Sequence, residues 1–475
     1  MQSKYGILHE SEQESEQTAQ EIAHILEEFL VPLLIVLDRL LDKRLVRTMV
    51  PCCVAIIRFR NTKQGLLLSE LGSYRDGYRG LSKTATAGTK RLSNLLRSLK
   101  WSVLQIDQYL LNEANKEVER LKAQGKRILC IWDGSVLEKA ESRTLEGVAP
   151  VLSSKAKRTN RSRKGLLFNA PQIRPIRVMG MEGTGALIAG LEGIPKIAIM
   201  SWWTTKGAYA TKLREEEERL LRICVRKWGL LLTYVFDRGY ASGPWLEVVE
   251  KFRVTFVIRW ITKHIFFDQE GNEKKLWEIG RGKRYLAHKQ IRDTTSGLKI
   301  ACDLWWTSVR HPKYTGQLSL VKARVKGHIC YLITNERVKT EEQAWEVFFP
   351  YKRRWQIETS FRSGKCELAL ESPRLWSFEN RLKLLGIVLL VYAFLLSLLE
   401  DVSKELREVL LRLKCHRTGK RCRETLVPLY RLRWALSRLW DDARPVLGSY
   451  FPPNLETLQV LASFSRGEAF LKNSG

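Results

Sequence analysis

The 475-residue sequence has few acidic residues for its many basic ones, and no apolar run long enough to cross a membrane. It contains 51 Asp and Glu against 80 Lys and Arg, a formal charge of +29. The shortage of acids favours a polyanionic partner such as nucleic acid, with an affinity that falls steeply as salt rises. The longest apolar run, Leu384 to Leu399, is shorter than the roughly 20 residues of a membrane span, so we expect a buried helix there.

Other common signals are also missing. Residues 1–17 are polar and lack a basic-then-apolar leader, so we expect a protein that is not exported. Nine dispersed Cys, an odd number, predict reduced thiols in a cytosol rather than a disulfide framework. Cys415, His416 and Cys422 lack the second cysteine pair of a zinc site, and no glycine-rich nucleotide loop is present. The sequence therefore indicates neither zinc nor ATP.

The most informative pattern is a set of four residues in one predicted helix. In chain order they are Tyr351, Arg354, Glu358 and Lys365. At about 100° per residue, this spacing places them within an arc of about 60° on one helix face. Pro350 suits a first helical turn, so we expect the helix to open at about Tyr351. The face carries a carboxylate between two cations and a phenol, a pattern that also fits a solvated ion-pair face.

Two aspartates follow predicted buried strands. The apolar run Ile128 to Trp132 is short enough for a strand, and Asp133 comes at its end. The run Leu230 to Phe236 also predicts a strand, and Asp237 comes at its end. Open α/β sheets place ligand sites at strand ends, although a single Asp there is usually a turn or cap residue. Two such acids together with Glu358 favour a shared site.

A site of three carboxylates requires a cation, because like charges at contact distance repel each other by several kcal/mol. Hard oxygen ligands suit Mg²⁺ or Mn²⁺, and two such ions about 3.5–4 Å apart activate a water or a 3′-hydroxyl for displacement at phosphorus. We expect the cations beside Glu358 to hold a phosphodiester backbone rather than the acid itself. Trp355, on nearly the same face, is either a core aromatic or a platform on which an unpaired base stacks.

These motifs resemble those of bacterial insertion-sequence transposases of the family known as insertion sequence four. The spaced residues from Tyr351 to Lys365 are similar to that family's Tyr-Arg-Glu-Lys signature. Asp133 in CIWDGS and Asp237 in YVFDRGY are similar to the first two acids of its Asp-Asp-Glu triad. The resemblance covers roughly Lys126 to Glu371.

The resemblance implies an α/β fold with a ribonuclease-H-like catalytic core that a β-rich insertion interrupts. The core is expected at 120–263 and 350–372, and the insertion at 264–349. A helical DNA-binding region is expected at 1–110, and a helical region for dimerisation or DNA contact at 373–475.

The resemblance also implies a DNA transposase that depends on Mg²⁺ or Mn²⁺, acts as a homodimer on paired terminal inverted repeats, and resides with the nucleoid in a prokaryotic cytoplasm. Such an enzyme exposes a 3′-hydroxyl and joins it to target DNA. Asp133, Asp237 and Glu358 would bind the metal ions. The implied DNA-binding residues are Tyr351, Arg354, Trp355, Lys365, Arg238 and Arg259. The family's base-flipping tryptophan of the insertion has three candidates here, namely Trp305, Trp306 and Trp345.

Local patterns predict the elements around these residues. Between the two aspartates we expect strands at 186–191 and 196–203 and a helix at 211–228, followed by a helix and a strand within 243–260. Beyond His264, alternating stretches between turn signals predict a β-rich segment. These stretches are 283–293, 298–308, 318–325 and 328–335.

Basic residues mark two further candidate DNA contacts. Lys83, Lys90, Arg91 and Arg97 fit either a helix-turn-helix-like surface or the charged face of a helical bundle. The densest basic run, 155–164, lacks apolar periodicity and predicts a flexible arm near the site.

Three other functions remain open from the residues alone. One is a nuclease with the same core that cleaves without joining. Another is a catalytically silent repressor that binds DNA, against which the three intact acids argue. The last, an RNA-binding protein, rests on charge alone.

Overall fold

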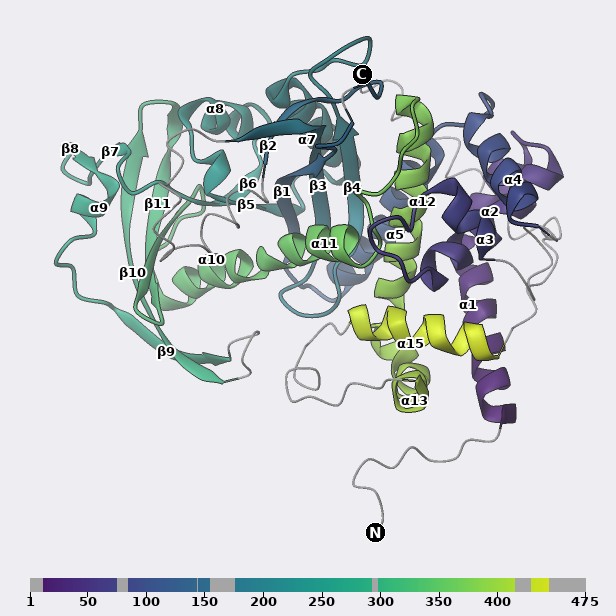
Figure 1. Cartoon of the computed structure of the whole chain (residues 1–475). Coiled ribbons are helices and arrows are strands. Elements are labelled where there is room, and N and C mark those ends of the chain that lie inside the picture. The colour runs from purple at the N-terminus through teal and green to yellow at the C-terminus, as the bar shows by residue number, and fades with distance from the viewer. Residues whose placement is uncertain are drawn as a thin grey trace, which may run out of the picture.

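A computed structural model describes residues 12–74, 84–142, 144–153, 176–292, 298–414 and 429–443. It contains one mixed sheet of twelve strands, with a β-rich extension at one end and a group of helices at the other (Figure 1). The protein is therefore mixed α/β, as the sequence predicts.

Five strands form the part of the sheet that carries the two aspartates. They are β1 (Ile128–Glu138), β3 (Arg177–Ala189), β4 (Lys196–Trp203), β5 (Leu232–Phe236) and β6 (Thr255–Arg259). Their order is β4-β3-β1-β5-β6, in which β3 is antiparallel to both neighbours and β1, β5 and β6 are parallel. Parallel neighbours need crossover connections, which α7 (Leu213–Trp228) and α8 (Gly243–Lys251) provide. A short strand, β2 (Ala149–Leu152), pairs with β3.

Strand β1 does not end at Asp133, and here the sequence prediction is wrong. β3 stays paired with β1 as far as Glu138, so the backbone remains extended beyond Asp133. β5 by contrast ends at Phe236, opposite Trp132. Asp133 thus lies where the parallel pairing stops, within a strand that continues. The predicted strand at 186–191 covers only the last part of β3 and runs two residues past its end.

The β-rich extension continues the central sheet. β12 is antiparallel to β6, with Ile333 opposite Ile258, and β11 and β10 follow outward. The four strands predicted beyond His264 correspond to β9–β12. The extension consists of β7 (Ile265–Phe267), β8 (Glu273–Lys275), α9 (Leu276–Ile279), β9 (Ala287–Arg292), β10 (Lys299–His311), β11 (Tyr314–Val325) and β12 (His328–Thr334).

Helices from both ends of the chain pack together beside β4. The N-terminal ones are α1 (Glu12–Asp38), α2 (Lys43–Arg58), α3 (Leu68–Ser73), α4 (Ala85–Arg97) and α5 (Leu104–Ala123). The C-terminal ones are α12 (Phe378–Ser397), α13 (Lys404–Lys414) and α15 (Leu429–Asp442). One hydrophobic core includes residues from both sets, so the two ends of the chain fold as one unit.

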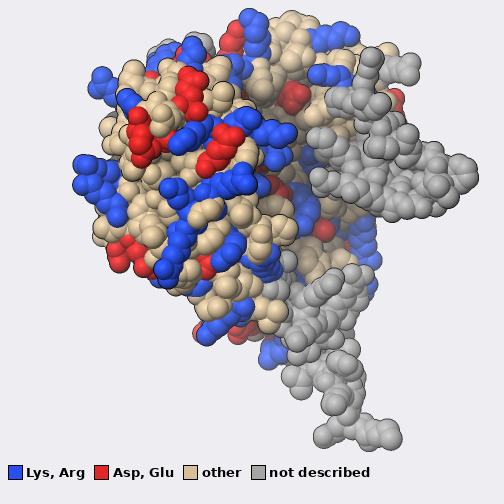
Figure 2. Space-filling model, turned by 90° about the vertical axis from the view of Figure 1, so that its left-hand side faces the viewer, with Lys and Arg blue, Asp and Glu red and all other residues tan. Residues whose placement is uncertain are grey.

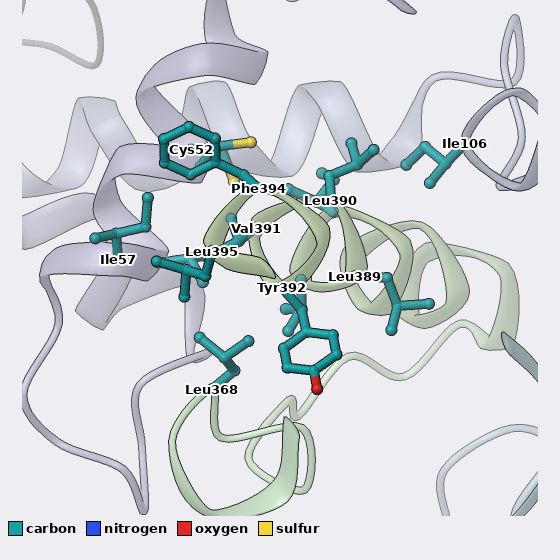
Figure 3. Close-up of a cluster of buried hydrophobic side chains, with 14 of the residues drawn as sticks. Cys52, Ile57, Ile106, Leu368, Leu389, Leu390, Val391, Tyr392, Phe394 and Leu395 are labelled. Atoms are coloured by element: carbon teal, nitrogen blue, oxygen red, sulfur yellow. The ribbon is translucent and has the colours of Figure 1, made fainter. Parts of the chain in front are cut away.

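Helix α12 is the centre of this core. It is long and apolar enough to cross a membrane, but 78% of its most apolar window is buried inside the protein. Its side chains are covered on opposite sides, with Phe394 near Cys52 on one and Tyr392 near Leu368 on the other (Figure 3). The buried helix expected at 384–399 is therefore present.

Two basic residues at the start of α12 are buried, which the sequence did not predict. Lys383 Nζ donates to the carbonyls of Leu96 at 3.1 Å and Ser98 at 2.8 Å, where α4 ends. Arg381 donates to the Glu146 carbonyl. The last carbonyls of a helix have no donor within the helix, so a lysine that reaches them satisfies an otherwise costly buried group.

Candidate active site

The helix predicted to carry Glu358 is two helices. α10 (Glu341–Arg353) and α11 (Trp355–Cys366) lie end to end between the extension and α12, with Arg354 at the break (Figure 1). At the break Arg354 N donates to Tyr351 O at 3.0 Å, a tighter pattern than an α-helix has. Tyr351 thus precedes the break and Glu358 follows it. The prediction of one straight helical face is wrong.

The helix also starts earlier than predicted, because Pro350 lies inside α10 rather than at its first turn. Thr340 caps α10, accepting a hydrogen bond from Gln343 N at 3.4 Å. A proline has no N–H, so the Glu346 carbonyl loses its helical donor. Arg127, just before β1, supplies another, with Nη1 donating to Glu346 O at 3.0 Å. The proline is therefore tolerated through a contact between distant parts of the chain.

The parallel register of β1 and β5 brings the two aspartates together. Trp132 lies opposite Phe236, so the residues that follow them, Asp133 and Asp237, emerge at the same edge of the sheet. α11 packs on β1 and presents Glu358 to that edge. Its position is tied to the helical core, because Tyr392 Oη of α12 donates to Ser360 Oγ at 2.9 Å.

Arg354 is the group on which the three acids converge. Its guanidinium lies 3.2 Å from Asp133 Oδ2 and 3.6 Å from Asp237 Oδ1, and it forms a short ion pair with Glu358. The Arg354 side chain is only 7% exposed, whereas Asp133 is 18%, Asp237 31% and Glu358 33% exposed. We predicted that the cations beside Glu358 would hold a phosphate backbone rather than the acid. In the structure the Arg354 guanidinium pairs with the three acids, and its contact with a phosphate backbone stays a prediction.

The electrostatics of the site follow from burial and crowding. Burial raises the pKa of Asp133 to about 7, and repulsion from Asp237 adds to this, although Arg354 opposes it. Burial disfavours the charged form of Arg354, but the surrounding acids and Tyr351 raise its pKa above the usual range. Burial also raises the pKa of Tyr351 to about 12, so this phenol stays protonated. An anionic Asp133 therefore depends on a nearby cation.

Residues 214–394 match the family model of the transposase DDE domain. The matched segment contains Asp237 and Glu358, and the match supports a DDE transposase. No curated protein matches the chain. Among solved structures, the chain is similar to a piggyBac transposase in a synaptic complex with hairpin DNA. The sequence identity is 12% and the TM-score 0.39, and the similarity covers 88% of this chain and 79% of that chain.

Transposase DDE domains generally use divalent metal ions, and the donor set here suits them. Three carboxylates are the hard oxygen ligands that Mg²⁺ and Mn²⁺ prefer. Within the described ranges, however, no group of three or more His, Cys, Asp and Glu is placed to hold a metal ion. The acids fit a metal by chemistry, and in this structure the Arg354 guanidinium lies within ion-pair distance of all three.

The other residues expected to touch DNA differ in exposure. Trp355 is 54% exposed, with the Arg354 guanidinium carbon 5.9 Å from its ring centre. Arg238 is exposed directly after Asp237, whereas Lys365 and Arg259 are half-buried. Their contacts with DNA stay predictions.

Of the three tryptophans considered for base flipping, Trp345 and Trp305 are buried, and Trp306 is half-buried. The N-terminal cations Lys90, Arg91 and Arg97 are exposed on α4. Lys83, the basic run 155–164 and the group Cys415, His416 and Cys422 lie outside the described residues.

Sequence reasoning missed a buried acid behind Asp237. Glu217 of α7 accepts a hydrogen bond from Tyr240, which follows Asp237 in the next turn, and pairs with Arg214 at 3.0 Å. Burial raises the pKa of Glu217 to about 7. The available signal was an acid on the helix face that also carries Leu220, Leu221 and Cys224, because an acid there must find a buried partner.

Proposed function

We propose that this chain is a divalent-metal-dependent DNA transposase that binds the terminal inverted repeats of its own element, exposes a 3′-hydroxyl and joins it to target DNA. The convergence of Asp133, Asp237 and Glu358 on one guanidinium carries the proposal. The family match over 214–394 supports it. On paired ends the enzyme would act as a homodimer.

The acids would hold two Mg²⁺ or Mn²⁺ ions, which supply Lewis-acid stabilisation at the attacking and leaving oxygens. Asp133 lies within β1 and Asp237 directly follows β5, so the pairing of these two strands fixes the distance between them. Glu358 comes from a helix and completes the set from the other side. Because Asp133 is the most buried of the three, it needs a neighbouring cation to remain an anion at neutral pH.

We further propose that the strands β4-β3-β1-β5-β6, with α7, α8 and α11, form a ribonuclease-H-like core made of residues 120–263 and 350–372. The mixed strand order and the two crossover helices support this proposal. Residues 264–349 would be the β-rich insertion. The helical regions 1–110 and 373–475 would serve DNA binding and dimerisation.

The phosphodiester backbone would be bound by the polar groups that surround the acids. These groups are Tyr351, Arg354, Lys365, Arg238 and Arg259. Arginine suits this role because its planar donors match two phosphate oxygens at once. In this role two N–H groups of Arg354 would donate to phosphate oxygens instead of to the carboxylates.

The β-rich extension offers further cationic surface. Figure 2, which faces this end of the molecule, shows Lys and Arg spread over it with acids between them. Exposed cations of β9–β11 include Lys289, Arg292, Lys299, Arg310 and Arg324. Helix α4 adds a face with exposed Lys90, Arg91 and Arg97 and contains no acidic residue. Both surfaces would add salt-dependent affinity for DNA.

Trp355 provides a separate test of the DNA contact. Trp355→Ala is expected to weaken binding to a duplex with an unpaired base by about 1–3 kcal/mol, because an exposed ring next to the acids can stack on that base. Fluorescence anisotropy at fixed salt measures the affinity. Trp376, which is 64% exposed in the segment between α11 and α12, provides the control variant Trp376→Ala. Equal losses in both variants would contradict a specific stacking role.

The proposed function is tested with labelled DNA that carries the inverted repeats flanking the gene, incubated with Mg²⁺ or with EDTA. A transposase gives metal-dependent cleavage and a covalent joint product. Cleavage without joining would instead indicate a nuclease with the same core. Specific binding without cleavage would indicate a silent DNA-binding protein.

A further inference from the structure

The position of Arg354 has a consequence for how the site takes up its ligands. Among the described residues, Arg354 is the only cation within ion-pair distance of Asp133, Asp237 or Glu358. Without it, the three carboxylates would repel one another, and no other described cation would lie within ion-pair distance of them. The guanidinium therefore already provides the counter-charge that the cluster needs.

The same guanidinium blocks the position that a divalent ion would need. Arg354 stays protonated at any ordinary pH, and the acids stabilise its charged form further. The charge of Arg354 cannot be removed by deprotonation. For the acids to bind a divalent ion, its side chain must therefore move away and pair with another anion. A phosphate group is suitable, because arginine binds it through two parallel hydrogen bonds.

The surroundings of Arg354 offer a second position for its guanidinium, beside the ring of Trp355. Its backbone lies at the break between α10 and α11, where the helix is least regular. Its guanidinium carbon is 5.9 Å from the ring centres of both Tyr351 and Trp355. The Trp355 ring is largely exposed, and an aromatic face attracts a guanidinium. A rotation toward Trp355 would carry the charge from the acids to the surface where DNA is proposed to bind.

We infer that Arg354 is the resident counter-cation of the carboxylate cluster, and that it moves to a DNA phosphate when the acids accept a divalent ion. Metal binding and DNA binding then favour each other. The metal ion neutralises the acids once Arg354 has left them, and the DNA phosphate pairs with the displaced Arg354 guanidinium. By thermodynamic linkage, the factor by which DNA tightens metal binding equals the factor by which the metal tightens DNA binding. The inference rests on the proposed function for the identity of the two ligands.

The test measures Mn²⁺ affinity, from the electron paramagnetic resonance signal of free Mn²⁺, with and without a short DNA duplex at fixed salt. In the wild-type protein, DNA is expected to tighten Mn²⁺ binding on the order of tenfold. Arg354→Gln is expected to bind Mn²⁺ without DNA on the order of tenfold more tightly than the wild type, and to respond little to DNA. Asp237→Asn, which removes a ligand, should weaken Mn²⁺ binding and so assign it to this site.

Arg362→Gln is the matched control, because Arg362 is exposed on the same helix and the substitution removes the same charge. It should behave like the wild type. Equal Mn²⁺ affinity of Arg354→Gln and Arg362→Gln without DNA would overturn the inference. So would a wild-type affinity that DNA does not change, a result that does not depend on whether the Arg354 variant folds.

The joining assay separates this inference from the proposed function. A protein that joins DNA but shows no coupling between Mn²⁺ and DNA keeps the transposase proposal and loses the role of Arg354. A protein that shows the coupling but neither cleaves nor joins DNA keeps the role of Arg354 and loses the transposase proposal.

Discussion

Glu358→Gln is expected to slow DNA cleavage and joining on the order of a thousandfold while the protein remains folded. Glutamine has nearly the same shape, and its carbonyl oxygen still accepts a hydrogen bond from Arg354. It lacks the negative charge that a divalent ion needs, and the other two acids cannot replace it because the pairing of β1 with β5 fixes their positions. Single-turnover joining with Mg²⁺ measures the loss.

The control for this substitution lies at the end of the same helix. Glu367 follows α11 and has no ion pair with the cluster, so Glu367→Gln should keep the wild-type rate. Circular dichroism before and after heating checks that both variants are folded. A Glu358→Gln protein with the wild-type joining rate would show that the acid on α11 takes no part in the reaction.

Leu390→Ala is expected to lower the free energy of unfolding by about 2–5 kcal/mol, because it opens a cavity in a part of the core that cannot close around it. Leu390 is fully buried on α12, between helices from both ends of the chain (Figure 3). Urea unfolding followed by tryptophan fluorescence measures the change.

The same substitution at an exposed site isolates the effect of burial. Leu99 is 91% exposed, so Leu99→Ala should change the free energy of unfolding by about 0.5 kcal/mol or less. A loss at Leu390 no larger than that at Leu99 would contradict the placement of α12 at the centre of the core. It would also reopen the question of a membrane-spanning role for this helix.

Several elements of the site were predictable because their signals are local. The apolar runs before Asp133 and Asp237 indicated strands, and two such strands in parallel register bring the residues that follow them to one edge. The alternating stretches beyond His264 gave β9–β12 for the same reason. Sequence could not show that β12 pairs with β6, since that pairing joins residues far apart in the chain.

The errors have a common cause, which is contact between distant segments. β1 continues past Asp133 because β3 pairs with it there, and Pro350 lies within α10 where Arg127 supplies the missing donor. The contact of Arg354 with the acids was likewise not predicted, because it depends on the strands that bring two aspartates to it. The spacing of residues along one helix contains none of this information.

The buried cations of α12 are a further case in which a contact between distant segments decides the environment of a residue. In the sequence they stand beside an apolar run, and nothing there indicates whether they are buried. Lys383 instead reaches the last carbonyls of α4 and so joins two helices from opposite ends of the chain. A buried charge is acceptable only where such partners exist, and sequence alone does not reveal them.

The central claim is that Asp133, Asp237 and Glu358 form one metal centre. The most direct test is an anomalous difference map of crystals of the protein bound to DNA and Mn²⁺. We expect anomalous density between the three carboxylates, with oxygen ligands at about 2.1 Å as in octahedral Mg²⁺ sites, and the Arg354 guanidinium moved to a phosphate. The claim would be contradicted if Mn²⁺ bound elsewhere on the protein, Arg354 remained among the three acids, and the cleaved DNA bond lay away from them.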